Sequence, residues 1–468
     1  MRSGDKLQEE DNDLATKSLA DYHSNRSLAI KVTKSNLGLG LYKLKALSTN
    51  VHANREATKK LIIGSLSGSY DMDGQVNWKW DANTQGWVAE TPPEHPLESV
   101  AEEVIAGYIF DVISSMKAVE EVIWKPERKD SEQTHKLVMD ALKTLPNLRH
   151  IDVSVTWLRT PLDLDSVTSL QEIIMHEISE TLQVDMFEGL AKAVAQNPQL
   201  HLIDIRNAGF YRRNIDEFQC LHQVFKYYPR EAPPLRLRDL RMFECRFRLD
   251  DITIPHLQHL TSLQLLCVEE HCTLPSQPAS QSGANLDRDL VLQGKDSFCS
   301  NLEDVWTAFR SIGVQLENIS IDMVPSSFLD YLASYSGLKK LNIDLHKLRN
   351  SELSDSMAAK FYDKSIIGHT NTLEELILST SYEGLWCIGP HNFKTLAQCK
   401  NMERLCIGVN LSQLPLPSDR NGDYKTAARS DIEHNLIKRP SWIAALPGHV
   451  KCIRYKVRQV LESPPRRS

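Results

Sequence analysis

The chain has 468 residues, of which 41% are hydrophobic and 25% charged, and its formal net charge is -7. This composition predicts a folded, soluble protein rather than a disordered one, and the mildly acidic balance without a basic block excludes the electrostatic footprint of a nucleic-acid-binding protein. No apolar run approaches the roughly 18 residues that a membrane-spanning helix needs, so no membrane segment is expected.

The cysteines and the N-terminal sequence indicate the compartment. The first residues lack an apolar segment, so no secretory signal is expected. Nine cysteines begin only at Cys220 and follow no regular spacing. This pattern favours reduced thiols and a cytoplasmic or nuclear location over a disulfide framework.

The N-terminal part of the chain has little regular patterning. Residues 1–18 are polar and charge-rich and are predicted to be disordered. Residues 19–96 are predicted to form an irregular cap. Within this cap, apolar residues alternate with polar ones around Trp78 and Trp80 and a turn-rich stretch follows, which predicts a Trp-rich β-hairpin over residues 70–90.

A repeated strand pattern, L-x-x-L-x-L, is the main signal in the rest of the chain. It is clearest at Leu237–Cys245, where the cysteine takes the position of a small residue that helps to close the turn. The second apolar position of the pattern recurs at Leu61, Val122, Ile151, Ile173, Ile203, Leu240, Leu266, Ile319, Leu341, Leu376, Leu405 and Ile453. Around Leu266 a register centred on Leu263 fits equally well.

Helical periodicity lies between most of these strands. Ala101, Ile105, Ile109 and Val112 recur at three- and four-residue spacing, which predicts a helix with one apolar face. Helical stretches often end at a breaker just before the next strand, as at Pro146, Pro198, Pro229, Gly337 and Pro447. One strand and one helix per repeat bury their apolar sides only when neighbouring repeats stack.

The sequence therefore predicts an α/β fold: a leucine-rich-repeat-like solenoid over residues 97–460, with a curved, mostly parallel sheet and helices on the convex side. Stretches rich in Pro, Ser and other polar residues predict loop insertions at 273–298 and 411–428. Residues 461–468 form a short basic tail.

The sequence offers few candidate motifs for catalysis or metal binding. Cys267, His271 and Cys272 could supply zinc ligands, but no second pair follows at a matching spacing. No nucleophile elbow, zinc-protease motif or phosphate-binding glycine loop occurs. The sequence therefore predicts a non-enzymatic protein, with no catalytic residue, no cofactor and no metal.

The outward side of the strands is the better candidate for function. Residues between the leucines point away from the core because strand side chains alternate, and in a solenoid they line the usual binding surface. A solvated strand face also needs charges of both signs, but the aromatic and arginine residues favour contact with a protein partner. The candidate partner-binding residues are Glu172, His176, Asp204, Arg206, Asp239, Arg241, Phe243, Asp322, Lys340, Asp344 and Glu375, with a second candidate contact in the loop at Tyr211, Arg212 and Arg213.

Several stretches resemble one family. They are Met116–Trp124, Leu142–His150, Leu190–Leu200, Tyr331–Leu338 and Ser381–Cys387. Together they resemble F-box and leucine-rich-repeat-like hypothetical proteins of mushroom-forming fungi, over roughly residues 100–410. The resemblance implies a substrate-recognition subunit of a cullin-type ubiquitin ligase, in which an F-box binds the ligase adaptor and the repeats bind the substrate.

The sequence departs from that family at the F-box itself. An F-box opens with Leu-Pro-x-Glu followed by short helices, and residues 1–60 contain no such motif. The leading hypothesis is therefore a protein-binding repeat scaffold derived from such an adaptor that has lost or truncated its F-box. The alternatives are a stand-alone interaction protein unrelated to ubiquitin and, more remotely, an enzyme with a site between the hairpin and the repeats.

Overall fold

The computed structural model describes most of the repeat region and parts of the N-terminal segment. The described residues are 26–49, 57–69, 78–81, 86–89, 96–178, 183–207, 221–245, 247, 249–268, 301–345, 350–380, 384–408 and 452–456. Several sequence predictions lie outside these residues, namely those for 1–18, 273–298, 411–428, 461–468 and for Tyr211, Arg212 and Arg213. The chain divides into two compact α/β units: unit 1 comprises Met1–Leu237 with Asp250–His256, and unit 2 comprises Arg238–Leu249 with Leu257–Ser468.

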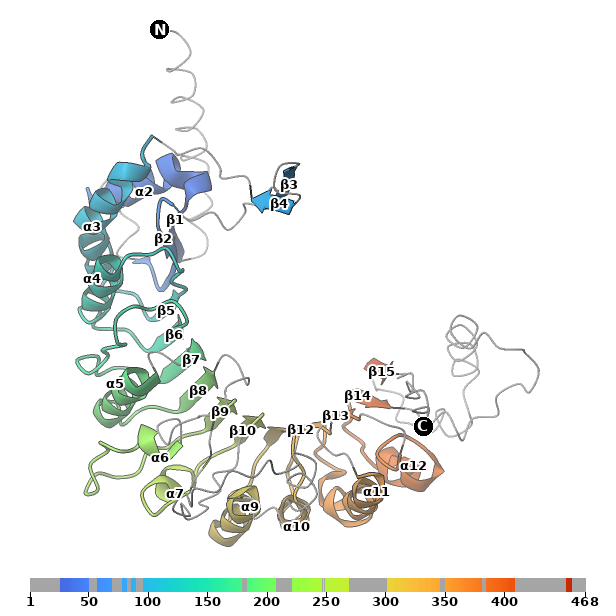
Figure 1. The fold of residues 1–468 in the computed structure, drawn as a ribbon. Helices are drawn as coiled ribbons and strands as arrows, with labels where there is room; N and C mark the ends of the chain where they lie inside the picture. The colour runs from blue at the N-terminus through green and yellow to red at the C-terminus, as the bar shows by residue number, and fades with distance from the viewer. Residues whose placement is uncertain are drawn as a thin grey trace, which may run out of the picture. The chain divides into compact units, whose positions relative to one another are not determined.

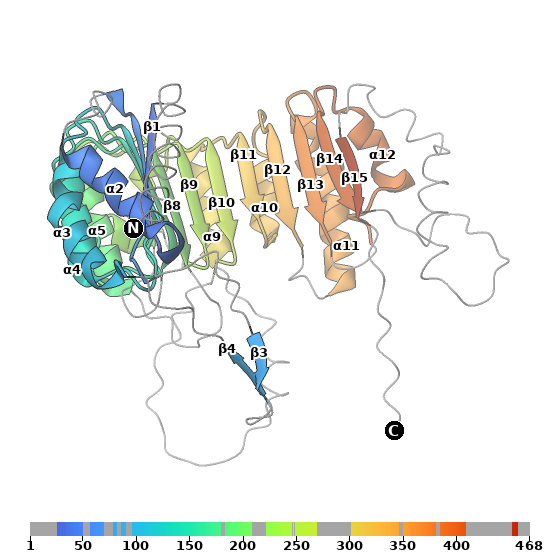
Figure 2. The same cartoon turned by 90° about the horizontal axis from the view of Figure 1, so that it is seen from above.

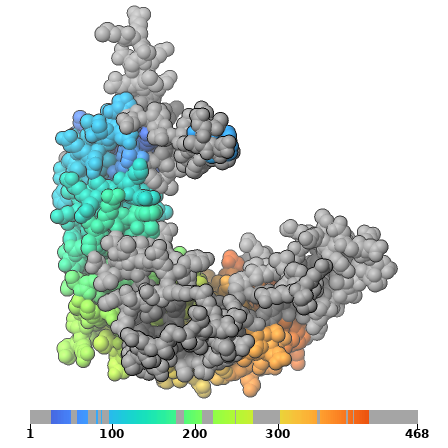
Figure 3. Space-filling view, in the orientation of Figure 1, coloured from blue at the N-terminus to red at the C-terminus, as the bar shows by residue number. Residues whose placement is uncertain are grey.

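Unit 1 is built on a parallel sheet whose strands follow one another in chain order. These strands are β1 (Ser27–Val32), β2 (Lys60–Leu66), β5 (Glu121–Trp124), β6 (His150–Ser154), β7 (Glu172–Ile178) and β8 (Leu202–Asn207). One face of the sheet is covered by α2 (Leu37–Ser48), α3 (Glu98–Ser114), α4 (Glu132–Leu142) and α5 (Gln183–Gln196) (Figure 1). The short helices α6 (Leu221–Val224) and α7 (Thr253–His256) complete the unit. The space-filling view shows α3, α4 and α5 as a continuous packed layer (Figure 3).

Unit 2 repeats this arrangement. Its parallel strands are β9 (Asp239–Phe243), β10 (Ser262–Leu266), β11 (Asn318–Ile321), β12 (Lys340–Asp344), β13 (Glu375–Ser379), β14 (Arg404–Gly408) and β15 (Cys452–Lys456). Its helices are α9 (Asn301–Ile312), α10 (Ser326–Leu332), α11 (Ser351–Lys360) and α12 (Pro390–Ala397), with a π-helical turn at Phe361–Ser365 and a 3-10 turn at Ile367–His369. Figure 2 shows the strands of unit 2 side by side, with α9, α10 and α11 behind them. Within the described parts of both units, no helix has the length and apolar character that crossing a membrane requires.

The core of each unit consists of stacked rows of the pattern's apolar residues. In unit 1 the second pattern position forms one buried row across the sheet, made by Leu28, Leu61, Val122, Ile151, Ile173 and Ile203. The corresponding buried row of unit 2 consists of Leu240, Leu263, Ile319, Leu341, Leu376 and Leu405. The structure thus places Leu263, not Leu266, in the core row, because Leu263 pairs with Leu240 and is buried whereas Leu266 is half-exposed.

The N-terminal segment is more regular than the sequence pattern predicted. The strand β1 and the helix α2 were not predicted, and they form a strand–helix unit that continues the sheet beyond β2. Glycines weaken the helical signal of α2, but the fold needs one of them. A Cβ atom at Gly40 would lie 3.0 Å from the carbonyl oxygen of Lys31 and 3.3 Å from the Cα atom of Val32, so the helix approaches β1 closely at this point. The predicted hairpin is present as the antiparallel pair β3 (Trp78–Asp81) and β4 (Gly86–Ala89).

Buried polar side chains tie neighbouring repeats together. Each accepts a hydrogen bond from a backbone N–H of the preceding repeat, in the segment that leads into that repeat's strand. The sheet does not pair these N–H groups, so the side chain satisfies a donor that would otherwise be buried without an acceptor. The pairs are Oδ1 of Asn197 with Leu170 at 2.7 Å, Nδ1 of His256 with Leu235 at 2.9 Å, and Nδ1 of His369 with Leu338 at 3.2 Å. Burial lowers the pKa of His256 from 6.5 to about 4, and burial also lowers the pKa of His369.

These two histidines predict a loss of stability in mild acid. The unfolded chain binds a proton on His256 near its ordinary pKa of 6.5, whereas the folded chain binds it only near pH 4. The free energy of unfolding should therefore fall as the pH decreases from 6.5 to 4, by roughly 3 kcal/mol from this residue. Urea denaturation at a series of pH values measures the slope.

The variant His256→Gln provides the control for this prediction. Glutamine keeps a hydrogen-bond acceptor for the Leu235 N–H but does not titrate, so the variant should lose a measurable part of the slope between pH 6.5 and 4. Equal slopes for the variant and the parent protein would contradict the assignment to His256.

Candidate functional site

The outward face of each sheet, away from the helices, carries the candidate site. In β5, β6, β9 and β10 buried residues alternate with half-exposed ones, so every second side chain points outward. Register places the outward residues of unit 1 in three rows. We call these the start row (Lys60, Glu121, His150, Glu172, Leu202), the middle row (Ile62, Ile123, Asp152, Ile174, Asp204) and the end row (Ser154, His176, Arg206).

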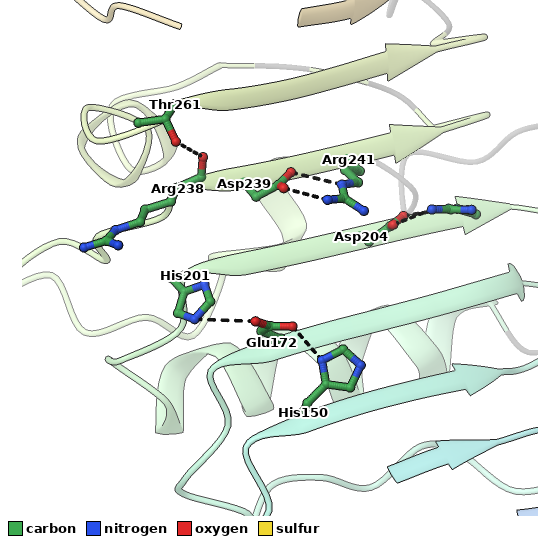
Figure 4. A network of polar contacts seen from close by, with 9 residues as sticks. His150, Glu172, His201, Asp204, Arg238, Asp239, Arg241 and Thr261 are labelled. Atoms are coloured by element: carbon green, nitrogen blue, oxygen red, sulfur yellow. Dashed lines mark hydrogen bonds and ion pairs between the residues drawn. The ribbon is translucent and has the colours of Figure 1, made fainter. Parts of the chain in front are cut away.

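The start row is a ladder of opposite charges. Nζ of Lys60 lies 2.7 Å from Oε1 of Glu121, and Nδ1 of His150 lies 2.6 Å from Oε2 of Glu172. His201, just before β8, approaches the other oxygen of Glu172 at 3.7 Å (Figure 4). The carboxylates of this row therefore already have basic partners within the protein.

The middle row combines apolar side chains with two aspartates, Asp152 and Asp204. Ile62, Ile123 and Ile174 are half-buried, on β2, β5 and β7. Between the last two, Oδ1 of Asp152 lies 3.0 Å from Nε2 of His176. Burial alone would raise the pKa of Asp152, but the hydrogen bond and charge of His176, helped by His150 and Lys125, lower it below its ordinary value.

Asp204 differs from the sequence prediction. Its side chain is fully buried, and both of its oxygens accept hydrogen bonds from Arg206, at 2.9 Å from Nε and 2.7 Å from Nη2. A buried carboxylate with a bidentate partner has a structural role, so the prediction of Asp204 as a partner-contact residue is wrong. Arg206 keeps 44% of its side-chain surface exposed and remains a candidate.

In unit 2 the pair Asp239 and Arg241 on β9 forms the same bidentate contact, with distances of 3.1 and 2.7 Å (Figure 4). Phe243, two residues further along β9, stands in register with Leu266 of β10, and both side chains are half-exposed. Phe243 is therefore the outward aromatic residue of this unit that is best placed to contact a partner.

Asp322 also has a structural place rather than an outward one. The residue is buried, and Oδ2 accepts a hydrogen bond of 2.7 Å from the backbone N–H of Cys267, which follows β10 with a φ of 54°. The carboxylate thus holds a left-handed turn of the neighbouring repeat. Cys245 has the turn-closing role expected from the pattern, because its Sγ donates to the carbonyl oxygen of Phe243 at 3.3 Å.

The remaining predicted residues lie on the last strands of unit 2. Lys340 is exposed, Asp344 is half-buried, and Glu375 forms an ion pair of 3.1 Å with Arg404. The middle outward positions of β11 and β12 are uncharged, and there Nδ2 of Asn342 donates to Oγ of Ser320 at 3.2 Å. The described outward face of unit 2 therefore combines charged side chains at the strand starts with uncharged polar side chains at the middle of β11 and β12.

Several outward residues of unit 1 were not predicted as site residues, among them Ile62, Ile123, His150 and Asp152. The strand pattern that locates β2, β5 and β6 was recognised, and its two-residue alternation places these side chains outward. That same signal could have found them.

Comparison with known proteins adds no family to this description. Among the described residues, no group of three or more His, Cys, Asp or Glu side chains is placed to hold a metal ion. No protein-family model and no curated protein matches the chain.

Proposed function

We propose that the chain is a leucine-rich-repeat-like solenoid that binds another protein on the outward face of its strands and catalyses no reaction. The strand pattern, the parallel pairing in chain order and the helices on one face of each sheet support the repeat interpretation. Each strand contributes outward residues at the same register positions. Neighbouring repeats therefore add to one surface rather than to separate sites.

The observation that carries the binding proposal is the middle row of unit 1. Ile62, Ile123 and Ile174 present apolar surface beside charges that are already neutralised by each other. Covering a charge that has a partner costs less than covering a free one. A partner protein can therefore bury the isoleucines without also burying a charge that has no partner. An apolar centre surrounded by polar groups is typical of a protein–protein interface.

We favour a stand-alone interaction protein over a ubiquitin-ligase adaptor. The family resemblance would place an F-box within residues 1–60. In the described part of that range, residues 26–49 form the strand β1 and the helix α2, and β1 pairs with β2 as part of the repeat sheet. Residues 26–49 are thus part of the repeat sheet and its helix layer, and they do not form the set of short helices that an F-box requires.

The double variant Ile123→Arg and Ile174→Arg tests the proposal. Partner recovery should fall by at least about tenfold, because two charges would replace apolar surface at the centre of the interface. The full chain is expressed with an affinity tag in cells of its source, and co-purified proteins are quantified by mass spectrometry. The partner that is lost is then purified and titrated directly against the parent protein and the variant.

The matched control is Val100→Arg on α3. Val100 is 43% exposed and lies on the helix side, so this change also replaces exposed apolar surface by a charge. Equal partner recovery from the face variant and the control would refute the outward face as the binding surface. Recovery of the cullin-ligase adaptor with the parent protein would favour the ligase role over the stand-alone one.

A further inference from the structure

A basic, aromatic edge lies beside the outward face of unit 1, where β5 and β6 end. The two turns that follow these strands expose five large side chains: Lys125, Arg128, Lys129, Trp157 and Arg159. In the part of the chain that the structure describes, none of the four cations has an ion-pair partner. We call these five residues the basic edge.

The first turn is held by a buried carboxylate. Oδ2 of Asp130 accepts a hydrogen bond of 2.9 Å from the N–H of Glu127, and Oδ1 accepts from Oγ of Ser65 and from the N–H of Leu66, both at 2.9 Å. Asp130 is only 1% exposed, so its charge serves this turn and is not presented at the surface. The only other acidic side chain of the turn, Glu127, is half-buried.

The turn after β6 is hydrogen-bonded to the turn after β5. The backbone N–H of Arg159 donates to Nδ1 of the buried His135 at 3.2 Å, and Nη2 of Arg159 donates to the carbonyl oxygen of Arg128 at 3.0 Å. The guanidinium of Arg128 lies 5.9 Å from the centre of the Trp157 ring. Trp157 is nevertheless 40% exposed. Trp157 and the two arginines are thus held next to one another before any partner arrives, which reduces the entropy lost on binding.

At the opposite edge of the same sheet, where the strands begin, three basic side chains have an acidic partner. There Lys59 pairs with Glu120, Lys60 with Glu121, and His150 with Glu172. Among the described residues, the four cations of the basic edge thus lie together without an ion pair, in a chain whose net charge is -7. An acidic partner would be drawn to this edge and oriented by it.

We propose that the basic edge docks an acidic peptide segment of a partner protein, with an apolar or aromatic side chain of that segment on Trp157. Carboxylates would meet Lys125, Arg128, Lys129 and Arg159, and the exposed indole would supply the apolar contact. The four cations cover only two adjacent turns, which suits a short acidic segment. A nucleic acid would extend beyond these two turns, and its phosphates would then lie over a protein with a net charge of -7, which repels them.

A phage-displayed library of random peptides, panned on the full chain, is the test. Enriched peptides should be rich in Asp and Glu and should carry an aromatic or large apolar residue. Fluorescence anisotropy with the best peptide should show at least about tenfold weaker binding to Lys125→Glu/Lys129→Glu and, independently, to Trp157→Ala. Binding should also weaken as salt increases.

The control Lys45→Glu/Lys136→Glu makes the same charge change at exposed lysines of α2 and α4 and should bind the peptide normally. Ile123→Arg/Ile174→Arg should not weaken peptide binding, because it adds positive rather than negative charge near the basic edge, and this separates the site from the proposed function of the outward face. Thermal unfolding of each variant confirms that it is folded. Enrichment of non-acidic peptides, no enrichment, or equal binding by all variants would overturn the proposal. So would a labelled oligonucleotide that binds this edge more tightly than the best peptide.

Discussion

Replacing Gly189 by alanine is expected to lower the free energy of unfolding by about 3 kcal/mol, although alanine favours helices more than glycine does. Gly189 lies inside α5, where a Cβ atom would overlap the carbonyl oxygen of Leu162 and would lie 3.2 Å from its carbonyl carbon. Both partners are backbone, so either the helix or the segment before β7 must move. Urea denaturation measures the change.

Gly107 provides the matched control on another helix of unit 1. It lies inside α3, it is exposed, and a Cβ atom there would have no neighbour within 4 Å. Gly107→Ala should therefore raise the free energy of unfolding, by about 0.5–1 kcal/mol. If both substitutions were stabilising, the close approach of α5 to Leu162 would be wrong.

Replacing Asn197 by alanine is expected to lower the free energy of unfolding by about 3–5 kcal/mol. The buried amide accepts from the N–H of Leu170 and donates to the carbonyl oxygens of Val167 and Ala193, each at 2.7 Å. Alanine leaves all three backbone groups buried without this partner, at a cost of about 1–3 kcal/mol for each group that water cannot reach. Urea denaturation of the purified variant measures the loss.

Asn147 is the control for this change, since it also joins two repeats through its amide. Its Nδ2 donates to the carbonyl oxygen of Lys117 at 2.8 Å, but the contact is exposed, so water replaces the lost bond. Asn147→Ala should cost about 1 kcal/mol or less. Similar losses at Asn147 and Asn197 would show that burial of the Asn197 amide does not determine its contribution.

The strands were predictable because their signal is local. An L-x-x-L-x-L segment buries its leucines whichever repeat lies beside it, and the predicted segments from Leu61 to Ile453 all fall at strands. The register of β10 was not predictable in the same way. Leu260, Leu263 and Leu266 are equally spaced, and only the pairing of Leu263 with Leu240 decides between them.

Strand alternation predicts which positions point outward, but it does not predict what each of these side chains contacts. Alternation places Asp322 at the end of its strand, yet its carboxylate holds the N–H of Cys267, 55 residues earlier in the chain. The basic edge was missed for a similar reason. Trp157 and Arg128 lie in turns outside any periodic pattern, and they meet only because β5 and β6 are neighbours.

The charge ladder of the start row bears on how such a chain can gain or lose repeats. From β2 to β7 the start row alternates basic and acidic side chains: Lys60, Glu121, His150, Glu172. Deleting the repeat of β5 would bring Lys60 beside His150, two basic side chains that cannot form an ion pair, and deleting that of β6 would bring Glu121 beside Glu172, two like-charged neighbours that destabilise a sheet. Deleting both together restores an opposite pair. In this part of the sheet, we therefore expect that repeats can be deleted or duplicated in pairs, because only a change of two repeats keeps a basic side chain next to an acidic one.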